Sequence, residues 1–204
     1  MSRFRRKSNR KNLKHFKKVV NYSAGLGQKS RNEVLHEYYK QNVNDTRLWQ
    51  DTIIDMLVIF CYALNKEYGF GKTRVNRFYE KTASISQCVR LNYVTFAELE
   101  KILQEEAKYT YDHVDYSKEN YSRENRIRLK TIEEVSVIMY FAMFEVYNFQ
   151  AKRLKKIGAC MAAETSAMAK GKITVADLEK VLDEKAHITF DKDFSHKEEA
   201  TACW

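Results

Sequence analysis

Apolar residues recur along most of the chain three and four positions apart, and this spacing predicts a set of three helices that occurs twice. In the first set, Asn44-Asp45-Thr46 is expected to cap a long, mostly apolar helix that runs to about Lys66. A second helix is expected from about Lys72 to Val89, and a third after Thr95. A separate polar helix is expected over 30–43, before the long one.

The second set repeats the first at a constant offset. Residues 52–111 align without a gap on 131–190, which is an offset of 79. Identical pairs include Tyr68/Tyr147, Phe70/Phe149, Arg74/Arg153, Thr95/Thr174, Leu99/Leu178 and Leu103/Leu182. Each copy contains a capping box, which begins at Thr95 or Thr174 and ends at Glu98 or Asp177. We therefore predict an all-α fold of two tandem, pseudo-symmetric three-helix units that pack through their long first helices.

The composition divides the chain around these two copies. The expected segments are a basic helical arm at 1–22, a connecting helix at 23–50, repeat 1 at 51–111, a polar linker at 112–130, repeat 2 at 131–190 and a tail at 191–204. Gly25 and Gly27 disfavour a helix between the arm and the connecting helix. The linker is nearly free of aliphatic residues, which is typical of a segment outside a core.

Several classes of protein are disfavoured by the same composition. The chain has no proline and only six glycines, which favours helices. It has no apolar run of about 18 residues, so no membrane span is expected, and no apolar stretch follows the basic N-terminus as in a secretory signal. The four cysteines form no CxxC motif, which fits reduced thiols. These features predict a cytoplasmic protein.

Positive charge is concentrated at the N-terminus. The formal net charge is +9, and residues 1–18 hold nine of the 36 basic residues and no acid, which leaves 27 basic against 27 acidic residues elsewhere. The nine are Arg3, Arg5, Arg6, Lys7, Arg10, Lys11, Lys14, Lys17 and Lys18. Such an arm binds phosphates through Coulomb attraction and counterion release, so it predicts contact with nucleic acid. An anionic protein or lipid surface, or a solubilising tail without a partner, are the alternatives.

Two further groups of basic residues follow the aromatic turns at 68–70 and 147–149. We call them the basic stripes: Lys72, Arg74 and Arg77 in repeat 1, and Lys152, Arg153, Lys155 and Lys156 in repeat 2. Helix N-terminal amides beside Lys and Arg suit phosphate oxygens, so both stripes are candidate nucleic-acid contacts. The alternatives are a solvated helix face or, for the matched Arg74 and Arg153, a structural ion pair. The expected acids are Glu98 and Asp177, or Glu105 and Glu184.

No arrangement of residues indicates catalysis, a metal or a cofactor, and we expect none of the three. The five histidines are His15, His36, His113, His187 and His196, and none stands at metal-ligand spacing from another His or a Cys. The sequence from Gly69 to Lys72 is too short and wrongly spaced for a phosphate-binding P-loop.

The stretch ALNKEYGFGKTRVNRFYEK, followed by QCVRLNYVTFAELEKILQEE, resembles a group of small uncharacterised proteins from phages and prophages of Gram-positive bacteria. Their pattern is an FGFGxxRLxRF turn and helix followed by a YVTxxDLxxxLxEE helix, behind a short basic N-terminus. The resemblance covers repeat 1, about 55 residues. Repeat 2 departs from it, because Asn148 and Gln150 replace Gly69 and Gly71. The resemblance implies a mobile-element protein in the cytoplasm of a bacterial host, and it implies no catalytic residue.

Three functions fit these features. The first is a non-enzymatic phage accessory protein that binds DNA or RNA through the arm and the basic stripes. The alternative is an anti-defence inhibitor of the anti-CRISPR kind, which binds a host nuclease or its guide-RNA complex and covers a basic channel with acidic residues. Glu98, Glu100, Glu105 and Glu106 are the candidates for that acidic face. The third is an oligomeric structural or virion-assembly protein.

Overall fold

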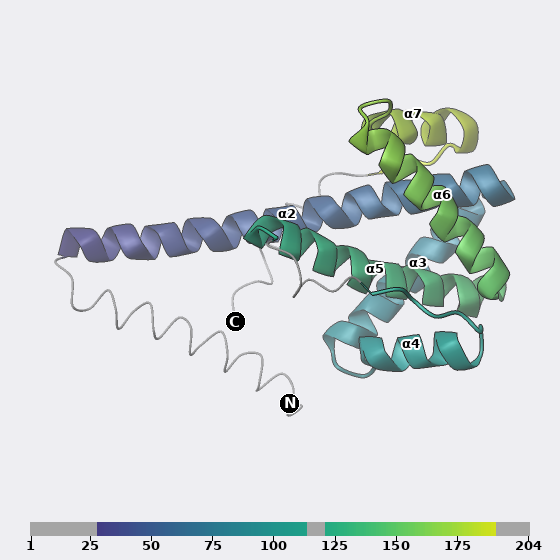
Figure 1. Cartoon of the computed structure of the whole chain (residues 1–204), viewed down its shortest axis with the longest axis horizontal. Coiled ribbons are helices and arrows are strands. Elements are labelled where there is room, and N and C mark those ends of the chain that lie inside the picture. The colour runs from purple at the N-terminus through teal and green to yellow at the C-terminus, as the bar shows by residue number, and fades with distance from the viewer. Residues whose placement is uncertain (1–27, 114–120, 191–204) are drawn as a thin grey trace.

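A computed structural model of the chain describes residues 28–113 and 121–190, and most of these residues are helical (Figure 1). The helices are α2 (Gln28–Tyr68), α3 (Lys72–Arg90), α4 (Phe96–Glu105), α5 (Arg123–Tyr147), α6 (Ala151–Ala169) and α7 (Val175–Ala186). No strand is present in the two described ranges, so the predicted all-α class is confirmed. The arm expected at 1–22 and the tail expected at 191–204 lie outside the described residues.

Helix α2 is a single helix of 41 residues, where the sequence predicted two. The expected cap at 44–46 is helix interior, because Thr46 Oγ1 donates back to the Asn42 carbonyl at 3.0 Å. No glycine or proline lies between Gln28 and Tyr68, so nothing in this stretch stops a helix. At 1.5 Å per residue α2 is about 60 Å long. Its N-terminal half projects beyond the other helices (Figure 1).

Helix α5 also begins earlier than expected. It starts at Arg123, inside the segment predicted as a linker over 112–130. The Ser122 side chain accepts from the Asn125 amide at 3.2 Å and so caps the helix. The last eight residues of the expected linker are therefore helical.

Each long helix packs mainly against the two short helices that follow the other long helix in the chain. Helices α2 and α5 pack against each other, as predicted, but α2 also packs against α6 and α7 whereas α5 packs against α3 and α4. The sequence predicted instead that each long helix joins the two short helices that follow it. An ion pair at 2.7 Å from Lys66 on α2 to Glu164 on α6 crosses between the halves, and so does the pair from Lys81 on α3 to Glu145 on α5.

The core explains why this exchange is possible. Nearly every residue from Met56 to Leu64 of α2 is buried, and so is most of the stretch from Ser136 to Met143 of α5. A helix that is apolar on more than one side can pack against a second long helix and still bury another face. Phe60 joins the two sides of the core, because its ring stacks on Phe78 at 5.1 Å and lies 5.8 Å from Tyr140.

The turns of the two halves have matching backbone conformations. Left-handed residues occur in pairs with the offset of 79: Gly69 (φ 61°) and Asn148 (52°), Asn92 (59°) and Gly171 (67°), and Lys108 (55°) and His187 (54°). Both predicted capping boxes are confirmed. In the first, Thr95 Oγ1 accepts from the Glu98 amide at 3.3 Å and the Thr95 amide donates to Glu98 Oε2 at 2.7 Å. Across the described residues, no helix is both long and apolar enough to cross a membrane.

Candidate nucleic-acid interface

The two basic stripes lie at the same end of the molecule, where α2 and α5 end and α3 and α6 begin. Two reciprocal hydrogen bonds join these helix starts. Tyr68 donates its hydroxyl to the Arg153 carbonyl at 3.2 Å, and Tyr147 donates to the Arg74 carbonyl at 2.7 Å. Burial raises the pKa of both tyrosines, which keeps the hydroxyls protonated and able to donate. We call this end, with the residues of both basic stripes, the end face.

Four aromatic rings lie under the end face. Tyr68 packs edge-on to Phe149, and Tyr147 packs edge-on to Phe70, each with ring centroids 4.9 Å apart. The two phenylalanines are 6.2 Å apart and only 3% and 4% exposed. These rings therefore hold the two turns together, and the phenylalanine faces are not available for stacking with a ligand. The sequence showed the two aromatic turns but not that they meet.

The matched arginines lie over this aromatic cluster. The Arg74 guanidinium stands 4.6 Å from the centroid of the Phe70 ring and donates to the Gly69 carbonyl. The Arg153 guanidinium stands 5.1 Å from the Phe149 ring. Both arginines are exposed, so each combines a cation–π contact with a charge that faces solvent.

The alternative prediction of a structural ion pair for Arg74 and Arg153 is wrong within the described residues. The carboxylates of Glu98 and Asp177 are used in the capping boxes. Those of Glu105 and Glu184 face the lysines four residues before them, Lys101 at 3.8 Å and Lys180 at 3.9 Å. The acids that the sequence offered are thus bound locally, on α4 and α7.

The starts of α3 and α6 suit an anion. Their N-caps, Gly71 and Gln150, provide no side-chain hydrogen bond to the first turn, and neither first turn contains an acidic residue. The Gln150 amide group instead donates to Asn148 Oδ1 at 2.8 Å. At α6 the first amide, of Ala151, donates to the Ala107 carbonyl at 2.9 Å. The helix dipole nevertheless leaves partial positive charge at both starts.

The cations of the end face differ in whether they form an ion pair. Lys156 forms an ion pair with Glu67 at 2.5 Å, and their hydrogen bond raises the pKa of the lysine and lowers that of the glutamate. Arg77 stands 79 positions before Lys156, but the residue 79 positions after Glu67 is Val146, so α5 offers Arg77 no equivalent acid. Within the described residues, Lys72, Arg77, Lys152 and Lys155 form no ion pair and are exposed.

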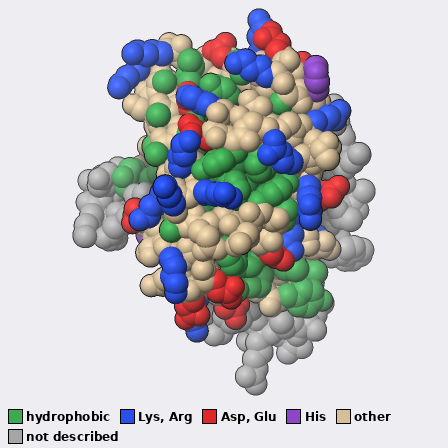
Figure 2. All heavy atoms as spheres, turned by 90° about the vertical axis from the view of Figure 1, so that its right-hand side faces the viewer, with side chains coloured by type: hydrophobic (Ala, Val, Ile, Leu, Met, Phe, Trp, Pro, Cys, Tyr) green, Lys and Arg blue, Asp and Glu red, His purple; other side chains and the backbone are tan. Residues whose placement is uncertain are grey.

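The end face is shallow and open. A depression of about 410 Å³ is lined by Tyr147, Asn148, Gln150, Lys152 and Arg153. Figure 2 looks onto this end and shows hydrophobic side chains at its centre with Lys and Arg side chains around them. Such a surface can receive an extended polyanion but does not enclose a small molecule. No three His, Cys, Asp or Glu side chains of the described part come together as metal ligands. The arm residues from Arg3 to Lys18 lie outside the residues that the structure describes.

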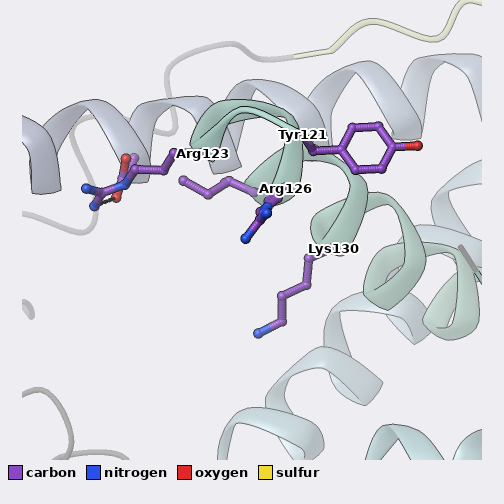
Figure 3. A pocket seen from close by; sticks show the side chains of 6 residues that line it. Tyr121, Arg123, Arg126 and Lys130 are labelled. Atoms are coloured by element: carbon purple, nitrogen blue, oxygen red, sulfur yellow. Dashed lines mark hydrogen bonds and ion pairs between the residues drawn. The ribbon is translucent and has the colours of Figure 1, made fainter. Parts of the chain in front are cut away.

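A second basic surface was missed by the sequence interpretation. It lies where the start of α5 meets α2 and includes Arg123, Arg126 and Lys130 (Figure 3). These residues fell in the expected linker and were not considered as a site. The signal that could have found them is their spacing of three and four, which places all three on one side of a helix.

Comparisons of the chain with protein-family models, with curated proteins and with solved structures find no match. The site therefore rests on its own geometry: two helix starts without a side-chain cap and seven basic residues, held side by side over an aromatic cluster.

Proposed function

We propose that the protein binds nucleic acid through the phosphate backbone, with the end face as the main contact of the folded body. The observation that carries this proposal is the meeting of both basic stripes at one end, fixed by the reciprocal bonds of Tyr68 and Tyr147. Phosphate contacts by Lys, Arg and helix N-termini give affinity without sequence specificity. The arm at 1–18 adds nonspecific attraction, and no catalytic step is part of the proposal.

We also infer that the body consists of two copies of one three-helix unit, related by a pseudo-twofold axis through the end face. The helix starts Lys72 and Ala151, and Phe96 and Val175, differ by the offset of the sequence repeat, and so do all three pairs of left-handed residues. A twofold arrangement would present the two basic stripes to the two strands of a duplex in equivalent ways. The resemblance of repeat 1 to phage proteins supports a role as a mobile-element accessory protein in the cytoplasm of a bacterial cell.

The test is a salt titration of binding to duplex DNA, single-stranded DNA and RNA. It compares the full chain, the chain without residues 1–18, and the double variant R77E/K155E, which removes one unpaired cation from each basic stripe. We expect steep salt dependence for the full chain, partial binding without the arm, and at least about tenfold weaker binding for R77E/K155E. K101E/K180E is the matched control, because it changes the charge equally on α4 and α7. Binding confined to the arm, or equal losses in both double variants, would overturn the end face as the contact.

A second candidate is inhibition of a host nuclease or its guide-RNA complex. The projecting half of α2 favours a protein partner, because Tyr39 is 56% exposed and Val43 is 66% exposed there. The acidic face considered from the sequence is less suited to this role, since Glu98 is used in a capping box and Glu100 faces His113 at 3.3 Å. Tight binding to a purified nuclease complex with only weak binding to free duplex would favour this candidate over the first.

A further inference from the structure

The groove between α2 and the start of α5 is a separate concave surface, at the opposite end of α5 from the end face. Its volume is about 560 Å³, and it is open to solvent. It is lined by Asp45, Tyr121, Arg123, Arg126, Ile127 and Lys130. Figure 3 shows the side chains of Arg126 and Lys130 extending from α5 on the same side of the helix. We call this surface the α2–α5 groove.

The three cations of the α2–α5 groove are held in different ways. Arg123 is used in the fold, because its guanidinium pairs with Asp45 at 2.5 Å and donates to Gln41 at 3.1 Å, which ties α5 to α2. Lys130 faces Glu134 at 3.5 Å in an exposed pair, which is worth little and is easily exchanged for another anion. Arg126 is exposed, and its guanidinium forms no ion pair or hydrogen bond with the described residues. Arg123 and Asp45 therefore form a fixed side of the α2–α5 groove, and the side chains of Arg126 and Lys130 beside them are available to a ligand.

The same offset of 79, extended just beyond the aligned ranges 52–111 and 131–190, compares these cations with residues of α2. The residues 79 positions before Arg126 and Lys130 are Arg47 and Asp51, so the same place in α2 has one cation and one acid. Arg123 likewise corresponds to Asn44. Of the three cations of the α2–α5 groove, only Arg126 thus has a basic counterpart in α2, so the cluster of three is particular to the start of α5.

We propose that the α2–α5 groove binds a second phosphodiester segment of the nucleic acid that contacts the end face, through Arg126 and Lys130. The proposal rests on the proposed function, since it assigns a further contact to the same ligand. From Arg126 to Tyr147, α5 rises about 32 Å, close to the roughly 34 Å of one duplex turn. To reach both surfaces a nucleic acid must run along α5, where it can contact the edge of the end face and the groove together if it is longer than one turn, whereas a shorter one reaches only one. Arginine suits this role because its planar fork matches phosphate oxygens.

The test is the same salt titration with a duplex of about 30 base pairs, comparing the full chain with R126E/K130E. We expect about tenfold weaker binding and a salt slope that is smaller by about two, as for two lost phosphate contacts. With a duplex of about 8 base pairs the difference from the unchanged protein should shrink. K40E/R47E is the matched control, because it makes the same charge change on exposed α2 positions turned away from Asp45. Arg123 stays unchanged, and R126Q/K130Q repeats the test with smaller perturbation.

The outcomes separate the two proposals. If R126E/K130E and K40E/R47E weaken binding equally, only net charge matters and the groove proposal is overturned. If R77E/K155E weakens binding while both R126E/K130E and R126Q/K130Q bind like the unchanged protein, the groove proposal falls and the end face stands. If the full chain binds no nucleic acid at low salt, both fall. Unchanged thermal melting of each variant shows that the fold is retained.

Discussion

Single residues show which differences between the two halves change the structure. Asn148 replaces Gly69 in the second aromatic turn, where repeat 2 departs from the phage pattern that repeat 1 resembles. Both residues nevertheless adopt the same left-handed conformation at the end of a long helix. Asparagine tolerates this conformation better than other residues with a side chain, so the exchange preserves the turn. The differences that matter are in charge, as at Glu67 and Val146.

We predict that Asn148→Ala lowers the free energy of unfolding by about 1 kcal/mol, whereas Asn148→Gly changes it by less than about 0.5 kcal/mol. Gly69→Ala should cost a similar amount to Asn148→Ala, because a Cβ at Gly69 meets no atom within 4 Å and only the backbone conformation is penalised. Urea denaturation of the three variants measures these values. An Asn148→Ala variant as stable as the unchanged protein would contradict the left-handed turn.

At the scale of elements, helix starts were predictable where the signal is local. Each capping box spans four residues that satisfy one another, so the starts of α4 and α7 followed from the sequence. The continuity of α2 through 44–46 and the start of α5 did not, because polar residues such as those at 44–46 and 123–130 are equally suited to a loop and to an exposed helix surface. Without a glycine or proline to stop it, a long helix continues into such a segment.

The capping boxes predict a loss of stability in acid. The hydrogen bonds from Thr95 and Thr174 lower the pKa of Glu98 and Asp177 below their ordinary values of 4.5 and 3.8. A carboxyl whose pKa is lower in the folded state stabilises the fold above its unfolded pKa, and this contribution is lost as pH falls through the folded pKa. We therefore expect the melting temperature to fall below about pH 4.5. The decline over this range should be shallower in T95A/T174A, as measured by circular dichroism, and an identical decline would argue against a role for the boxes.

At the scale of the molecule, the repeat itself limited what the sequence could predict. Because α2 and α5 carry similar apolar faces, the pattern gives no preference between docking a short helix on the long helix of its own half or of the other half. Only the turns at 69–71 and 148–150 direct α3 and α6, and their geometry comes from the left-handed Gly69 and Asn148. The same turns decide that the basic stripes meet. The sequence could therefore name the residues of the end face without placing them together.

The exchange of short helices between α2 and α5 makes neither half self-sufficient. A polypeptide of residues 28–113 lacks the helix that covers α3 and α4, and one of residues 121–190 lacks the helix that covers α6 and α7. Produced as two separate chains, each should be poorly folded alone, whereas mixing the two should yield a one-to-one heterodimer with the helical signal and cooperative melting of the intact protein. Two independently folded fragments would contradict the crossed packing. The peptide link between the halves thus sets the local concentration of each half for the other, and the fold behaves as a tethered heterodimer.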